Sequence, residues 1–122
     1  MMVNKVIYIP IVVLILVVTP CLLGQTQVEM DREAAHDYHD ADQQLDVAYK
    51  VLLSMLDQEN KDRLTRAQQA WLAYRDAQAD YEASKGQGGS ITPVLLFAAK
   101  EQLTRDRIAV IKSEIDYQKK NN

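Results

Sequence analysis

Residues that interrupt helices are confined to one short part of this chain after position 24. The last 98 residues contain only four Gly or Pro residues, and all four lie between positions 86 and 93. Because Gly and Pro are the residues that most often end or break a helix, the stretches 25–85 and 94–122 carry no strong interruption. Thirteen alanines in the same region add intrinsic helix preference. The sequence therefore predicts an all-α fold of long helices with few joints.

Apolar residues recur at helical spacing in three segments. The first set, in a helix expected from about 30 to 56, is Ala34, Tyr38, Ala41, Leu45, Ala48, Leu52 and Leu56. The second set, in which only Gln78 is polar, is Leu64, Ala67, Trp71, Tyr74, Gln78 and Tyr81. The third set is Leu96, Ala99, Leu103, Ile108, Ile111 and Ile115. Steps of three and four residues put each set on one helix face. Because no helix can bury such a stripe alone, we expect a small antiparallel three-helix bundle.

Two joints separate these helices. The first, at 57–60, is polar and short, and either Asp57 or Asn60 is a suitable N-cap for the second helix. The second, at 85–91, is longer and rich in glycine. Thr92 followed by Pro93 is typical of an N-cap and a first helical residue. The loop at 85–91 is therefore the one irregular feature of the expected bundle.

Residues 1–24 form a hydrophobic leader. They hold 18 apolar side chains and one basic residue, Lys5, but no acidic residue. A basic residue, an apolar run at 6–23 and the small Gly24 follow the order of a secretory signal. We therefore expect residues 1–24 to be a signal peptide and residues 25–122 to be the exported domain, periplasmic or secreted.

Two alternatives to cleavage after Gly24 remain open. The segment 18–21 partly resembles a bacterial lipobox, in which Cys21 would be lipidated, although Pro20 stands where Gly, Ala or Ser is expected. The apolar run of 18 residues is also at the lower limit for a membrane span. Both alternatives keep the domain outside the cytoplasm, with membrane contact only through the N-terminal segment.

Charge and cysteine usage exclude several classes of function. Without Lys5 the chain holds 13 basic and 17 acidic residues, a formal net charge of −4. An acidic balance argues against nucleic-acid binding, which needs a surplus of Lys and Arg. It suits a cationic partner, and it is equally typical of ordinary solubility. Because Cys21 is the only cysteine, a domain cleaved after it has no disulfide and no thiolate metal site.

Candidate catalytic and metal-binding residues are few. His36, His39, Asp40 and Asp42 are the most ligand-like cluster. We interpret them as an acid-rich, hydrated helix start, because no second ligand group is visible elsewhere in the chain. The four serines after residue 25 lie in no Gly-x-Ser-x-Gly elbow, and no phosphate-binding loop is present. We expect no enzyme activity, no metal and no cofactor.

One aromatic and charged segment of the second helix is informative. Trp71 and Tyr74 lie on the expected core stripe, where their bulk would anchor the bundle. Arg75 lies beside both rings, so its stem is held against the aromatic region. A confined guanidinium needs a carboxylate, and Asp42 and Asp46 of the first helix are the candidates. A bidentate pair of this kind would fix the register of two helices.

These residues form part of a wider resemblance. Its four segments are Ala41-Asp42 with Leu45 and Tyr49, then 67–77, then Gly88-Gly89-Ser90, and finally 103–107. In this order and spacing they resemble the lysozyme inhibitor LprI-like N-terminal domain family over about residues 29–115. The resemblance implies a small secreted or lipid-anchored helical domain of bacterial envelopes that inhibits lysozyme. Family members commonly carry cysteines where this chain has Ala34 or Ala35, Ala79, and Ala98 or Ala99, so apolar packing alone must hold the bundle.

The resemblance suggests how inhibition works. Host lysozymes are usually basic and cleave glycan with two carboxylates in a cleft. We expect Gly88, Gly89 and Ser90 to form a protrusion that enters the cleft, with Asp76 and Asp80 as an attracting rim. The alternative is that the loop only joins two helices. At the level of the whole protein, the alternative is a structural or interaction module of the envelope, or a toxin-neutralising protein, with no lysozyme target.

Overall fold

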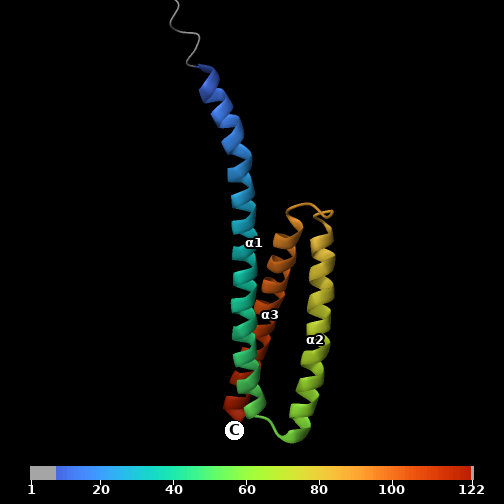
Figure 1. Ribbon diagram of the computed structural model, residues 1–122. Helices are drawn as coiled ribbons and strands as arrows, with labels where there is room; N and C mark the ends of the chain where they lie inside the picture. The colour runs from blue at the N-terminus through green and yellow to red at the C-terminus, as the bar shows by residue number, and fades with distance from the viewer. Residues whose placement is uncertain (1–7, 122) are drawn as a thin grey trace, which may run out of the picture.

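A computed structural model describes the backbone of residues 8–121, with side chains from residue 26 onward, as three helices (Figure 1). They are α1 (Tyr8–Ser54), α2 (Gln58–Ser84) and α3 (Thr92–Asn121), and no strand occurs among the described residues. The predicted all-α three-helix bundle is confirmed. Of the expected signal segment, residues 1–7 and the side chains of the rest, Cys21 included, lie outside the described residues. Within the part that is described, no helix combines the length and the apolar character needed to cross a membrane.

Helix α1 is longer than the periodicity predicted. We expected a start near residue 30, but the helix begins at Tyr8 and continues through position 24 without a break. A single Gly inside a helix costs only about 1 kcal/mol relative to Ala, so Gly24 does not suffice to end it. Its 47 residues extend about 70 Å at 1.5 Å per residue. The N-terminal part of α1 consequently projects beyond the hairpin formed by α2 and α3 (Figure 1).

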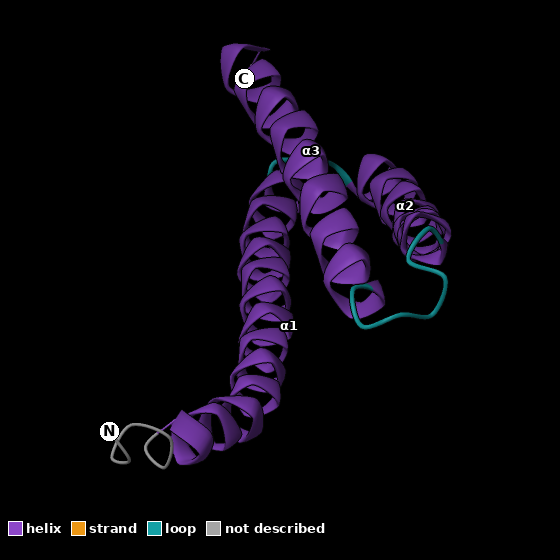
Figure 2. Ribbon diagram, turned by 90° about the horizontal axis from the view of Figure 1, so that it is seen from above, coloured by secondary structure: helices purple, strands orange, loops and turns teal. Residues whose placement is uncertain are grey.

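Helix α3 lies between the other two. It packs against both α1 and α2, and the view from above shows it in the middle (Figure 2). Helices α1 and α3 run in one direction and α2 in the other (Figure 1). The main apolar cluster joins α1 to α3 and consists of Leu45, Ala48, Leu52, Ile108, Ile111 and Ile115. Each large aliphatic side chain buried in this way contributes about 1.5 to 3 kcal/mol.

Most of the predicted stripe of α1 and the second half of the predicted stripe of α3 are buried, whereas Leu96, Ala99 and Leu103 of α3 are only partly buried. The predicted stripe of α2 is wrong over its second half. Tyr74 and Tyr81 are exposed, with Tyr74 at 54%, so Tyr74 does not anchor the core. The buried residues there are Arg75, Ala79 and Ala83. This face is turned by one residue, or about 100°, from the expected one. Alanine is small enough to let α2 approach α3, whereas tyrosine keeps its hydroxyl in water.

The two joints also differ in detail from the prediction. Asp57 is the N-cap of α2, because its Oδ1 accepts a hydrogen bond of 2.9 Å from the backbone N–H of Asn60. Thr92 is the first residue of α3 rather than its N-cap. The Ile91 carbonyl accepts the N–H of Leu95 at 3.0 Å, and the Thr92 Oγ1 is buried without a hydrogen-bond partner.

Candidate functional site

The glycine-rich loop lies at the end of the bundle from which α1 projects. Gly88, Gly89 and Ser90 are all exposed, and a side chain added at Gly88 would meet open space. The Ser90 carbonyl accepts a hydrogen bond of 2.7 Å from Gln27 Nε2 of α1. The same amide nitrogen donates to Asp31 Oδ1 at 2.9 Å. We call residues 27–33 and 85–91 together the loop end; it is built from α1 as well as from the α2–α3 connection.

The two acidic residues expected beside the loop lie at different depths along α2. Asp76 is eight residues before the end of the helix at Ser84, or about 12 Å along its axis. Its Oδ1 accepts a hydrogen bond of 3.0 Å from Arg75 Nε and lies 3.5 Å from Lys100 Nζ. Asp80 is only about 6 Å before that end and is exposed. Asp80 therefore lies near the loop, whereas Asp76 lies farther from it and pairs with Arg75 and Lys100.

Acidic residues of α1 also lie near the loop, in addition to Glu82 of α2, which pairs with Lys85. Glu29, Asp31 and Glu33 follow Gln27 within two helical turns, and Glu29 and Glu33 are exposed. The apolar periodicity predicts a first helix that begins near residue 30, so it does not place residues 27–33 beside the loop. The density of acids between 29 and 46 was the available signal.

Arg75 is the centre of a buried cluster that connects all three helices. The residue is only 5% exposed, and its Nη1 donates to Asp42 Oδ1 at 2.7 Å. Its guanidinium carbon lies 5.3 Å from the ring centroids of both Tyr38 and Trp71. Burial alone would lower the pKa of Arg75, but the hydrogen bonds to Asp42 and Asp76 outweigh it and raise the pKa. Arg75 therefore stays charged inside the bundle.

Of the two carboxylates that the sequence suggested for Arg75, one is its partner, through a single hydrogen bond rather than the bidentate pair expected. Asp42 is the partner of Arg75, whereas Asp46 accepts from Lys50 at 2.6 Å on the surface of α1. Trp71 is partly buried against the apolar cluster, and Leu45 belongs to that cluster. Asp42, Leu45, Trp71 and Arg75 therefore all contribute to packing.

Helix α3 completes this cluster with two cations that the sequence analysis did not single out. Lys100 Nζ lies 5.5 Å from the Tyr38 ring, and the Arg107 guanidinium lies 5.7 Å from the Trp71 ring. Arg107 Nε also donates to the buried Gln68 Oε1 at 3.0 Å, and burial lowers the pKa of Arg107. Three cations near two rings fix the register of the helices, so this cluster holds the bundle together rather than forming an open site.

The histidine-containing cluster lies within α1, not at its start as we had interpreted it. His36 is exposed, with its Nδ1 3.6 Å from Asp37 Oδ1. The ring of His39 contacts Tyr38 at 5.1 Å between centroids. Among the described residues, no three or more His, Cys, Asp or Glu side chains come together in a way that could hold a metal ion.

A mainly apolar groove lies between α2 and α3 and reaches toward the loop. It has a volume of about 430 Å³, and its lining consists of Tyr74, Gln78, Glu82, Lys85, Leu95, Ala98, Ala99, Gln102 and Leu103. Glu82 and Lys85 form an ion pair at its rim, which lowers the pKa of Glu82 and raises that of Lys85. Tyr74 lines the same groove, and its exposed ring is available for contact with a partner.

Fold and geometry define a small all-α protein with a buried polar cluster and an exposed loop end. The chain matches the family described as "Lysozyme inhibitor LprI" over residues 23–110. This range covers the described side chains of α1, all of α2, the loop and most of α3, and the chain belongs to this family. The family is one of inhibitors rather than of enzymes.

A relative shares 29% identity with this chain over 105 residues, which cover 75% of this chain and 76% of the relative. It is the uncharacterized protein R02472 of Rhizobium meliloti (strain 1021). No solved structure matches the chain.

Proposed function

We propose that this protein binds lysozyme outside the cytoplasm and inhibits it, which protects peptidoglycan. The observation that carries the proposal is the match to the lysozyme inhibitor family across residues 23–110. The matched residues include the loop end and the cluster around Arg75. Peptidoglycan lies outside the cytoplasmic membrane, so the leader at 1–24 and its expected role in export agree with this function.

We place the contact at the loop end. Gly88 and Gly89 carry no side chain and Ser90 carries a small one, so the backbone of this loop can approach a narrow cleft closely. Glu29, Glu33 and Asp80 supply negative charge in its vicinity. Such charge speeds the approach of a basic enzyme and orients it, without requiring a large contact area.

The groove between α2 and α3 extends this contact surface. Tyr74 and the neighbouring Leu95 and Leu103 offer apolar area beside the loop. Tyrosine is among the residues that most often dominate binding energy at protein interfaces. We therefore expect the loop to block the cleft and the groove to hold an adjoining part of the enzyme surface.

A lysis assay tests the proposal. Protein recovered from cells expressing the full chain is added to lysozyme and a bacterial suspension, at low and at high salt. We expect dose-dependent protection that weakens with salt, because exposed charges are screened. No protection at micromolar concentration would contradict the proposal and favour the alternative of an envelope interaction module.

Matched variants test the contact surface. Ser90→Trp adds bulk to the exposed loop, and Ser113→Trp adds the same bulk to an exposed position on α3 away from the loop. We expect Ser90→Trp to weaken inhibition at least about tenfold, equivalent to about 1.4 kcal/mol, and Ser113→Trp to leave it unchanged. Equal inhibition by both variants would remove the loop from the mechanism.

A further inference from the structure

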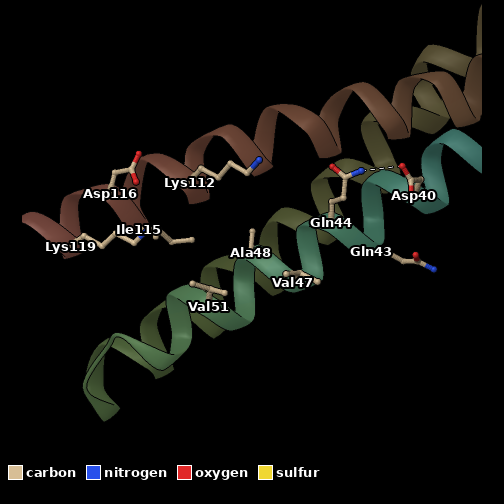
Figure 3. A pocket seen from close by; sticks show the side chains of 10 residues that line it. All are labelled: Asp40, Gln43, Gln44, Val47, Ala48, Val51, Lys112, Ile115, Asp116 and Lys119. Atoms are coloured by element: carbon tan, nitrogen blue, oxygen red, sulfur yellow. Dashed lines mark hydrogen bonds between the residues drawn. The ribbon is translucent and has the colours of Figure 1, made fainter.

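A second groove lies between α1 and α3, and no residue of α2 lines it (Figure 3). Its volume is about 650 Å³. The residues around it are Asp40, Gln43, Gln44, Val47, Ala48, Val51, Lys112, Ile115, Asp116 and Lys119. It is separate from the loop end and has no part in the proposed contact with lysozyme.

The later part of the α1 wall of this groove, at 47–51, is apolar, whereas the earlier part carries Asp40, Gln43 and Gln44. Val47 and Val51 lie one helical turn apart and are 64% and 42% exposed. Ala48 and Ile115, both buried, continue the apolar surface beneath them. Adjacent aliphatic side chains left in water favour a partner that covers them, because burial of apolar surface is favourable.

Four charged side chains lie along the groove. Asp40 of α1 lies at one end and Lys119 of α3 at the other (Figure 3). Lys112 and Asp116 lie between them on α3, with Lys112 nearer the Asp40 end (Figure 3). The charges therefore alternate along the groove in the order Asp40, Lys112, Asp116 and Lys119, so a copy turned end for end presents each charge to one of opposite sign.

We propose that a second copy of the chain covers this groove. The same faces of the two copies pack against each other about a two-fold axis, with the two α1 helices antiparallel. The axis passes near Val47 and Val51, so the four valines of the two copies pack together. The antiparallel arrangement brings Asp40 of each copy toward Lys119 of the other. A parallel arrangement would bring Asp40 toward Asp40 and Lys119 toward Lys119, which like-charge repulsion disfavours.

The self-complementary charge pattern is what selects a second copy as the occupant. An unrelated helix would need an acid and a base at matching positions, whereas a rotated copy presents them by symmetry. The apolar area is small, so we expect a reversible dimer with a dissociation constant in the range of about 1 to 100 μM.

Sedimentation equilibrium on protein recovered from cells expressing the full chain measures this dimer. Asp40→Lys and Lys119→Asp each place like charges together and are expected to weaken the dimer at least about tenfold. The double variant restores the opposite-charge pairs in reverse and is expected to recover most of the lost affinity. Circular dichroism verifies that each variant keeps its helix content.

A pair of valine variants tests the apolar part. Val47→Asp is expected to abolish the dimer, whereas Val110→Asp, at a similarly exposed position outside the groove, leaves it intact. A chain that stays monomeric up to hundreds of micromolar overturns the proposal, and the groove then serves a different protein or none. A dimer that Val47→Asp does not weaken, or a double charge variant without recovery, also overturns it. None of these outcomes depends on lysozyme.

Discussion

At the scale of single residues, Arg75 determines which face of α2 is buried. A guanidinium keeps its charge at any ordinary pH, so it can enter the interior only with partners for that charge. Asp42 and Asp76 supply carboxylates, and Tyr38 and Trp71 supply ring faces. Once these contacts form, the face that holds Arg75 must turn inward.

Replacing Arg75 tests this role. Arg75→Leu removes the charge and leaves the Asp42 and Asp76 carboxylates without their partner. Both carboxylates are about half exposed and can be rehydrated, so we expect a loss of about 2 kcal/mol in the free energy of unfolding, below the 3 to 5 typical of a fully buried pair. The control Arg63→Leu breaks an exposed pair with Glu59 and should cost less than about 1 kcal/mol. Urea unfolding measures both, and equal costs would mean that Arg75 is not a structural centre.

Tyr38 makes the stability of the bundle depend on alkaline pH. Burial raises the pKa of Tyr38 above its ordinary value of 10.0, although the charge of Arg75 acts in the opposite direction. Because the folded pKa exceeds the unfolded one, this contribution to stability is fully present below pH 10.0 and is lost as the pH rises through the folded pKa.

The absorbance of tyrosinate follows this ionisation directly. We expect Tyr38→Phe to remove the tyrosine ionisation that occurs at the highest pH in the folded protein. We also expect it to make the stability of the protein less sensitive to high pH. Tyr81→Phe removes an exposed tyrosine as the control. If the latest step persisted in Tyr38→Phe, burial of this phenol would not be the cause.

At the scale of helices, the sequence predicted α1 and α3 better than α2. The stripes of α1 and α3 end in large aliphatic residues such as Leu52 and Ile111, which the fold buries in one cluster. In the second half of α2, at 73–84, alanines occur on several faces, and the large apolar residues are Tyr74 and Tyr81, which tolerate water. Hydrophobic period alone therefore could not choose between the Tyr74 face and the Arg75 face. The choice depends on contacts with Asp42 and Tyr38 that only the fold brings together.

The sequence predicts only the part of the candidate site that has local signals. The loop follows from its glycines, because Gly86, Gly88 and Gly89 are local signals. The contribution of residues 27–33 to the loop end does not follow from a local signal, because it depends on how far α1 extends before the bundle begins. No Gly or Pro lies between residues 25 and 30, so nothing there ends the helix, and apolar periodicity does not report such a continuation.

Gly86 packs closely against the beginning of α3. A Cβ at this position would lie 2.6 Å from Thr92 Oγ1 and 3.2 Å from a methyl carbon of Ile91. We expect Gly86→Ala to destabilise the protein by about 1 to 3 kcal/mol through this overlap. Thr92→Ala in the same chain removes both the obstructing oxygen and a buried hydroxyl without a partner, and should recover much of the loss. Thermal unfolding of the two single variants and the double variant measures the recovery; a purely additive double variant would contradict it.

At the scale of the whole molecule, the position of the loop relative to the leader has consequences for function. The Ser90 carbonyl accepts a hydrogen bond from Gln27. Gln27 is six residues, or about 9 Å of helix, after Cys21. The turn between α1 and α2 and the end of α3 lie at the opposite end of the bundle (Figure 1). A chain held in a membrane by its leader would therefore direct the loop end toward the lipid surface. Antiparallel α1 helices would also direct two leaders in opposite directions, so two copies anchored in one membrane could not form the proposed dimer.

This geometry predicts that release from the membrane controls inhibition. Pro20→Ala brings the segment 18–21 closer to a lipobox and should favour tethering through Cys21, whereas Cys21→Ala prevents lipidation. A gap of about 9 Å is narrower than one helix with its side chains, so a folded enzyme cannot enter between the loop end and the lipid. On the proposed function, we therefore expect the tethered Pro20→Ala form to protect less per molecule than the released Cys21→Ala form, in lysis assays on cells with equal amounts of each. Membrane fractionation establishes where each variant resides. Equal protection by a tethered and a released form would show that lysozyme is met by a surface other than the loop end, because only a surface facing away from the lipid is equally accessible in both.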